Sequence, residues 1–143
     1  MCKYAGFFSG TITPINQIME NMIPLLAKTF TGIVAIEHLF ILWMEMFAWE
    51  TTGKKVFKQV LPEELFKPTK GLAANQGLYN GFLAEGLIWS FFISDLVWQK
   101  NVACFFLICV IVAGLYGAIS ASKKIFFTQA LPAIIALIFV ALT

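Results

Sequence analysis

The stretch AIEHLFILWMEMFAWE, residues 35–50, decides how the chain is interpreted. It is apolar enough to cross a membrane, yet it holds three glutamates and the only histidine of the chain. At 3.6 residues per turn, Glu37, His38 and Glu45 fall within about 100° of one another, whereas Glu50 lies on another face near the helix end. Ionisable groups inside a bilayer cost roughly 2.5–3.5 kcal/mol each, so this shared face needs polar partners elsewhere in the chain.

The composition predicts an integral membrane protein with a single domain over residues 1–143. Of the 143 residues, 59% are hydrophobic and 13% are charged, whereas soluble domains carry about 25% charged residues. The net charge of +2, carried by ten lysines and no arginine, argues against a nucleic-acid partner. The expected partner is the lipid bilayer.

Four apolar segments predict an all-α bundle of four transmembrane helices, because about 20 apolar residues cross the roughly 30 Å hydrocarbon core. Thr13 as an N-cap and Pro14 at the first helical position predict a short amphipathic helix over 14–22, on the membrane surface. The run from Pro62 to Glu64 predicts a short interfacial helix in the first loop. The four predicted spans cover residues 24–49, 72–93, 102–120 and 125–143.

The lysines predict the topology. Seven of them lie in the first and third loops, against three elsewhere. Because cytoplasmic loops carry an excess of lysine and arginine, both of these loops are expected in the cytoplasm and both termini outside. This is the pattern of a multi-pass protein of the plasma membrane.

A second polar stripe is predicted on the span over 72–93. Asn75, Gln76, Tyr79 and Asn80 share one side of that helix, which we call the amide stripe. Small residues four positions apart on another side, Gly77 and Gly81, favour close approach of two helices. Counting helical rise from the loops brings Asn75 and Gln76 level with Glu45 and places Asn80 about two-thirds of the way back to the midplane. The predicted result is a polar pocket in the cytoplasmic half, lined by Glu37, His38, Glu45, Asn75, Gln76, Tyr79 and Asn80, with Tyr116 and Gln129 as further lining residues.

Such a pocket has two interpretations, a hydrogen-bonded network that locks the helices or a binding site. We favour small-molecule or ion binding and proton-coupled transport, since a Glu/His pair can exchange protons near neutral pH. Glu37 and Glu45 would bind the proton or cation, His38 would titrate with them, and the amide stripe would orient the ligand. Four spans enclose little space for alternating access, so a homodimer is expected.

Alternatives stay open. The same cluster suits a membrane-embedded enzyme doing acid/base chemistry on a lipid-like substrate, and it also suits a structural or assembly partner. One histidine, with no thiolate at ligand spacing, makes a poor metal site, and no cofactor is predicted. Glu85 lies off the amide stripe, so it either faces another protomer or makes a second polar contact.

Three stretches resemble a known family: EHLFILWMEMFAWETTGKKVF (37–57), AANQGLYNGFLAEGLIW (73–89) and TQALPAIIAL (128–137). They are similar to the small bacterial membrane proteins of the domain-of-unknown-function 1304 family, over about residues 27–143. The resemblance implies a four-span inner-membrane protein and carries no activity. The chain departs from the family in its longer N-terminal stretch and in Glu85, where a small residue would be usual.

Overall fold

A computed structural model of the protein describes residues 14–143, and this range is helical with no strand. The all-α prediction is therefore confirmed for the described part of the chain. Short helical turns interrupt or extend the longer helices, two of them π-helical and one 3-10. The helices are α1 (Pro14–Phe47), α2 (Lys54–Phe57), α3 (Lys70–Ser90), α4 (Leu96–Ser120) and α5 (Leu131–Leu142), and the turns are η1 (Trp49–Gly53), η2 (Glu63–Leu65) and η3 (Phe126–Ala130).

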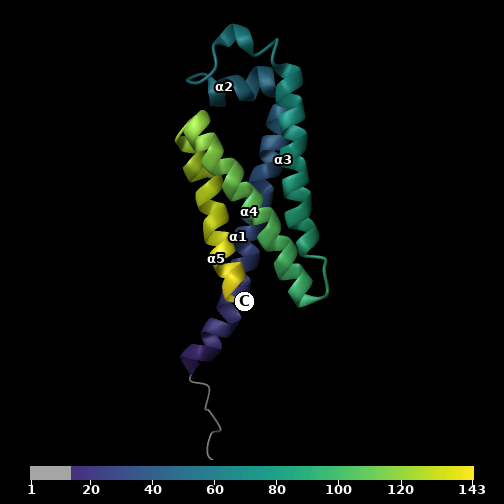
Figure 1. Cartoon of the computed structure of the whole chain (residues 1–143), viewed down its shortest axis with the longest axis vertical. Helices are drawn as coiled ribbons and strands as arrows, with labels where there is room; N and C mark the ends of the chain where they lie inside the picture. The colour runs from purple at the N-terminus through teal and green to yellow at the C-terminus, as the bar shows by residue number, and fades with distance from the viewer. Residues whose placement is uncertain (1–13) are drawn as a thin grey trace, which may run out of the picture.

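Helix α1 is one continuous helix of 34 residues and not a surface helix followed by a separate span. Pro24 lies inside it without ending it, as happens where a helix tolerates the loss of one backbone hydrogen bond. The predicted amphipathic segment forms its first turns, which are exposed and project away from the other helices (Figure 1). The predicted cap at Thr13 lies outside the described residues.

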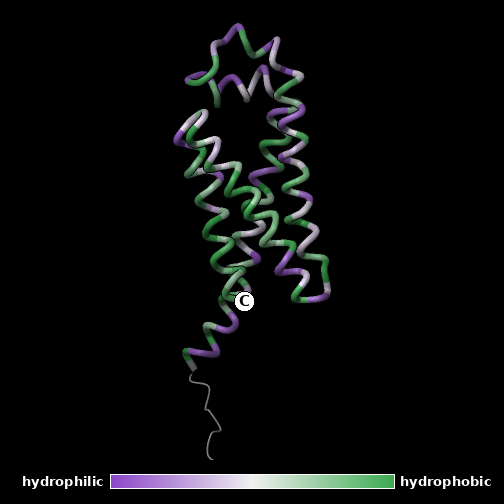
Figure 2. Tube along the Cα trace, in the orientation of Figure 1, coloured by the Kyte–Doolittle hydropathy of each residue, from purple (hydrophilic) through white to green (hydrophobic). Residues whose placement is uncertain are grey.

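Two helices are long and apolar enough to cross a membrane, α1 over Ile15–Phe47 and α4 over Leu96–Ser120. The apolar stretch Phe126–Leu142, which joins η3 to α5, is shorter. Helix α3 is not one of the described helices that are long and apolar enough to cross a membrane, because its amide stripe lowers its mean hydropathy. Figure 2 shows apolar residues along α4 and α5, with hydrophilic ones concentrated around α2. The four-span interpretation stays a prediction.

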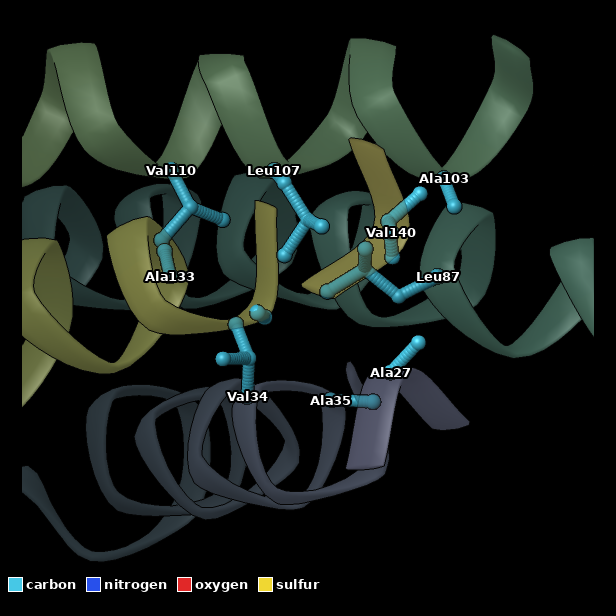
Figure 3. Close-up of a cluster of buried hydrophobic side chains, with 10 residues drawn as sticks. Ala27, Val34, Ala35, Leu87, Ala103, Leu107, Val110, Ala133 and Val140 are labelled. Carbon is cyan, nitrogen blue, oxygen red and sulfur yellow. The ribbon is translucent and has the colours of Figure 1, made fainter. Parts of the chain in front are cut away.

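The long helices pack side by side around small side chains. Helix α1 contacts α3 and α5, and α4 contacts the same two helices. Their shared core is made largely of alanine, valine and leucine (Figure 3). Small residues also bring backbones together, since the ring of Phe106 on α4 packs directly on Gly86 of α3. The labelled core residues are Ala27, Val34, Ala35, Leu87, Ala103, Leu107, Val110, Ala133 and Val140.

The first loop folds back over the end of the helices and is held by its own contacts. The Trp49 ring packs against Phe57 and Phe66, with ring centroids 5.5 and 5.1 Å away, and its Nε1 donates to Thr69 Oγ1 at 3.2 Å. Ion pairs of 3.2 Å join Lys54 to Glu63 and Lys70 to Glu50. Lys124 Nζ donates to Gln59 Oε1 at 3.1 Å, which ties the turn after α4 to this loop. Both lysine-rich loops therefore lie at one end of the molecule.

Candidate functional site

Helices α1 and α3 lie in close contact at Gly77. A Cβ atom added there would lie 2.9 Å from Met46 Cγ, 3.0 Å from Glu45 Cβ and 3.1 Å from the Leu42 backbone oxygen. Gly81, one turn along α3, faces the Leu42 side chain at 3.1 Å. The absence of side chains at these two positions lets α1 lie directly on α3. This close approach brings the Glu45 carboxylate within reach of the amide stripe.

A carboxylate–amide hydrogen bond joins the two helices at this level. Asn80 Nδ2 donates to Glu45 Oε2 at 3.0 Å and also to the Gln76 backbone oxygen at 3.1 Å. Both side chains are half-buried. The orientation of the Asn80 amide follows from these bonds, because nitrogen is needed opposite two acceptors. Two residues predicted to share a site, 35 positions apart in the chain, are thus in direct contact.

Beside Glu45 lies a hollow of about 310 Å³, between the first loop and the ends of α1 and α3. We call it the Glu45 hollow. Its wall is mostly apolar, and the Thr69 hydroxyl is already engaged, donating to the Leu65 oxygen at 2.6 Å. Glu45 and Gln76 remain as its polar side chains. The full lining is Glu45, Trp49, Phe57, Val60, Leu61, Thr69, Leu72, Ala73 and Gln76.

His38 and Glu37 are placed differently from Glu45. His38 is buried, with 1% of its surface exposed, and its Nδ1 donates to the Val34 backbone oxygen at 2.8 Å, one turn back on its own helix. Glu37 is half-buried, and it makes no side-chain hydrogen bond or ion pair within residues 14–143. It lies two turns from Glu45, about 12 Å along α1. The structure thus does not join these two residues to Glu45 by direct hydrogen bonds.

The remaining predicted lining residues point elsewhere. Asn75 is exposed, and Tyr79 is 53% exposed with its ring edge-on to Phe82. Tyr116 is 72% exposed on α4, and Gln129 is half-buried in η3. Within the described range, the Glu45 hollow is lined by none of these four residues, and neither is a second hollow at the other end of the helices. That same range holds no group of three His, Cys, Asp or Glu side chains able to bind a metal ion.

A second hollow, of about 240 Å³, lies at the opposite end of the helices and was missed by the sequence reasoning. We call it the Lys28 hollow. The sequence holds one signal for this hollow, the helical spacing of its polar residues. Lys28 and Thr31 share one face of α1, and Gln99 and Lys100 lie in the first turns of α4. Thr31 is 2% exposed, and its Oγ1 has no hydrogen-bond partner among residues 14–143. The hollow is lined by Pro24, Ala27, Lys28, Thr31, Ser90, Phe91, Leu96, Gln99, Lys100, Ala103, Val140 and Thr143.

These features define a small all-helical protein with two apolar helices of membrane-spanning length and a carboxylate–amide contact on one of them. Residues 32–141 match the family described as "Protein of unknown function (DUF1304)", and the chain belongs to that family. It is 37% identical over 107 residues to "Uncharacterized protein YpaA" of Lactococcus lactis subsp. lactis (strain IL1403), covering 74% of this chain and 88% of that protein. No solved structure matches the chain.

The family match confirms the resemblance seen in the sequence. Glu45 and Asn80 lie inside the matched range, whereas Lys28 and Thr31 precede it.

Proposed function

We propose that the protein is a four-span membrane protein that binds a small molecule or ion at Glu45 and couples its movement to a proton. The observation that carries this proposal is the 3.0 Å bond from Asn80 to Glu45 between α3 and α1. A half-buried carboxylate with one amide partner is the kind of intramembrane acid that marks an ion or proton path. Glu37 and His38 lie two turns deeper on α1 as further groups for the same path.

Protonation of Glu45 and the orientation of Asn80 depend on each other. An ionised carboxylate only accepts hydrogen bonds, so Asn80 offers Nδ2 to it. A protonated carboxyl group gains an O–H donor, while its carbonyl oxygen still accepts a weaker bond from Nδ2. If Asn80 turns to accept from this O–H through Oδ1, the bond from Nδ2 to the Gln76 oxygen breaks. A bound proton therefore changes what the polar wall of the Glu45 hollow presents to a ligand.

The surroundings of the Glu45 hollow support access from the lysine-rich end, which the sequence predicts to be cytoplasmic. Its other walls come from the first loop, through Phe57, Val60 and Leu61. A ligand entering there would meet apolar side chains first and Glu45 and Gln76 at the helix wall. We infer a small ligand with one polar or cationic group, consistent with a hollow of about 310 Å³.

The apolar walls also favour a second candidate, a membrane-embedded enzyme in which Glu45 transfers a proton to or from a lipid-like substrate. A third candidate, a structural or assembly partner, draws support from His38, which bonds its own helix. The two alternatives differ in readout from transport. The enzyme releases a chemically altered lipid, whereas the structural partner binds no ligand at Glu45.

We further propose a homodimer in which a second copy covers the outer face of α3. Asn75, Tyr79 and Glu85 are exposed on that face. Exposure of an acid and an amide to lipid is costly, and contact with another protein chain removes that cost.

Transport is tested in proteoliposomes that contain a pH-sensitive dye and receive a panel of small cations, amines and carboxylates outside. A substrate should produce a proton flux that Glu45→Gln abolishes, because glutamine keeps the shape and loses the proton. Glu64→Gln, an exposed acid in the first loop, is the control and should leave the flux intact. An undiminished flux in Glu45→Gln would exclude Glu45 as the coupling group, and lipid turnover lost in that variant would favour the enzyme.

A further inference from the structure

We propose that the Lys28 hollow binds the acidic group of an amphipathic anion, a carboxylate or phosphate that carries an apolar tail. It is a site separate from the one assigned above. Thr31 lies 14 residues before Glu45 on α1, a rise of about 21 Å, so the two hollows occupy opposite ends of the helices. Residues 24–31, inside α1, and the ends of α3, α4 and α5 all contribute to its wall.

The Thr31 hydroxyl is the first observation for a ligand. A threonine inside a helix ordinarily bonds a backbone oxygen one turn back, yet Thr31 Oγ1 finds no partner in the described part of the chain although the residue is only 2% exposed. Buried hydroxyl groups are nearly always hydrogen-bonded. Because Thr31 lines the hollow, an acceptor oxygen placed there would complete its bonding.

The charges of the lining are the second observation. Two lysines line the hollow, and no aspartate or glutamate side chain does. Lys100 Nζ donates to the Ala141 backbone oxygen at 2.9 Å, which leaves two of its three N–H groups available. Lys28 forms no ion pair with another described residue. Asp95, which precedes α4, is engaged as its N-cap, accepting from the Trp98 backbone nitrogen at 2.9 Å.

The remaining walls set the rest of the ligand. Pro24, Ala27, Leu96, Ala103 and Val140 present apolar surface to the hollow. Gln99 adds no free donor, because its Nε2 already donates to the Ser90 and Ile93 oxygens at 3.2 and 3.4 Å. A volume of about 240 Å³ is slightly below the roughly 300–1,000 Å³ of drug-sized pockets. An acidic group followed by an apolar chain fits this combination, as does the end of an anionic lipid.

Lys100 could have the purely structural role of bonding the last carbonyls of α5. The variant Thr31→Val therefore tests anion binding at the same hollow without changing Lys100. Valine has the shape of threonine without the hydroxyl, so it removes a buried group that has no partner. Anion binding should weaken in Thr31→Val while the unfolding temperature stays equal or rises. A purely structural threonine would instead show a lower unfolding temperature and no effect on anions.

The experiment uses the full chain in a neutral detergent, titrated with decanoate and with decanol by isothermal calorimetry. Decanoate should bind more tightly than decanol. Lys28→Gln and Lys100→Gln should each weaken decanoate binding on the order of tenfold, the size expected for a hydrogen bond to a charged group. Lys123→Gln, which changes a lysine at the other end, should have no effect.

Inorganic phosphate and phosphatidylglycerol, the second by native mass spectrometry, distinguish the two sources of the anion. Retention of phosphatidylglycerol over phosphatidylcholine, lost in Lys28→Gln, identifies a lipid, whereas decanoate or phosphate binding without retained lipid identifies a free anion. Equal affinity for decanol and decanoate, or decanoate binding unaffected by both lysine variants, would overturn the proposal. Lys28 is exposed, so its variant keeps the test valid if Lys100→Gln fails to fold.

Discussion

Substituting Gly77 by alanine tests whether α1 and α3 pack as closely as the structure has them. The added Cβ would lie 2.9 Å from Met46 Cγ, 3.0 Å from Glu45 Cβ and 3.1 Å from the Leu42 oxygen. Met46 can turn away, but the positions of Glu45 Cβ and the Leu42 oxygen are fixed by the backbone. Helix α1 must therefore move by a few tenths of an ångström along this contact.

The expected loss in the free energy of unfolding follows from two contributions. Overpacking of a tight contact costs about 1–3 kcal/mol, and stretching the 3.0 Å bond from Asn80 to Glu45 removes part of another 1.5–3 kcal/mol or so. The higher helix propensity of alanine relative to glycine offsets roughly 1 kcal/mol of this loss. We expect a net destabilisation of about 1–4 kcal/mol for Gly77→Ala.

Two other glycines provide matched controls. Gly32 lies inside α1 with nothing within 4 Å of an added Cβ, so Gly32→Ala should be neutral or stabilising. Gly81→Ala should fall between the two, because only the flexible Leu42 side chain obstructs it. Unfolding by denaturing detergent, followed by circular dichroism, measures all three. Equal stability of Gly77→Ala and Gly32→Ala would refute the close packing of α1 on α3.

Three further predictions concern other contacts. Asn80→Ala should lower the free energy of unfolding by about 1–3 kcal/mol in the same assay, because it leaves the half-buried Glu45 without its amide partner; an unchanged value would mean that the bond carries no stability. Glu85→Leu should shift the dimer–monomer balance seen by native mass spectrometry if a second copy covers α3, and an unaltered balance would remove Glu85 from the interface. Trp49→Phe deletes the donor of the 3.2 Å bond to Thr69 and should speed tryptic cleavage in the first loop several-fold, whereas equal cleavage would assign loop order to aromatic packing alone.

The meeting of Glu45 with the amide stripe could be predicted from the sequence, because it depends on helical period and rise. Gly77 and Gly81 share a face of α3 and bear no side chain there. The rise of two antiparallel helices predicts Asn75 and Gln76 level with Glu45. These quantities are properties of any regular helix. The structure differs in the partner, because it is Asn80, predicted nearer the midplane, that donates to Glu45. Helix α3 begins and ends within three residues of the predicted span 72–93, whereas α4 begins six residues before residue 102 and η3 and α5 together cover most of the span predicted over 125–143.

The direction of individual side chains could not be predicted in this way. His38 shares a helical face with Glu45, yet its ring bonds the Val34 backbone oxygen one turn back on the same helix. Helical period gives the face of a residue but does not give its side-chain rotamer. Helical period predicts which face of α3 carries Tyr79, but it does not predict whether another helix packs on that face. Among the described residues no helix does. The Lys28 hollow depends on how the ends of three helices meet the side of α1, and the sequence of one segment alone does not predict that arrangement.

The continuity of α1 past Pro24 is another difference from the sequence-based prediction. A proline commonly starts a helix, and residues 14–22 have an amphipathic pattern of their own. In the structure one helix serves both segments, and its first turns extend beyond the neighbouring helices. Because α3, α4 and α5 do not reach that level, packing does not decide where the helix begins.

The most direct test of the central claim is infrared difference spectroscopy of the protein in nanodiscs while the pH is changed. We expect a carboxyl C=O band that disappears in Glu45→Gln, shifts in frequency in Asn80→Ala and is unaltered in Glu64→Gln. Such a pattern would show that Glu45 exchanges a proton and that Asn80 is its partner. A carboxyl band that persists in Glu45→Gln, or one that is insensitive to Asn80, would contradict the assignment of a coupled proton site at this contact.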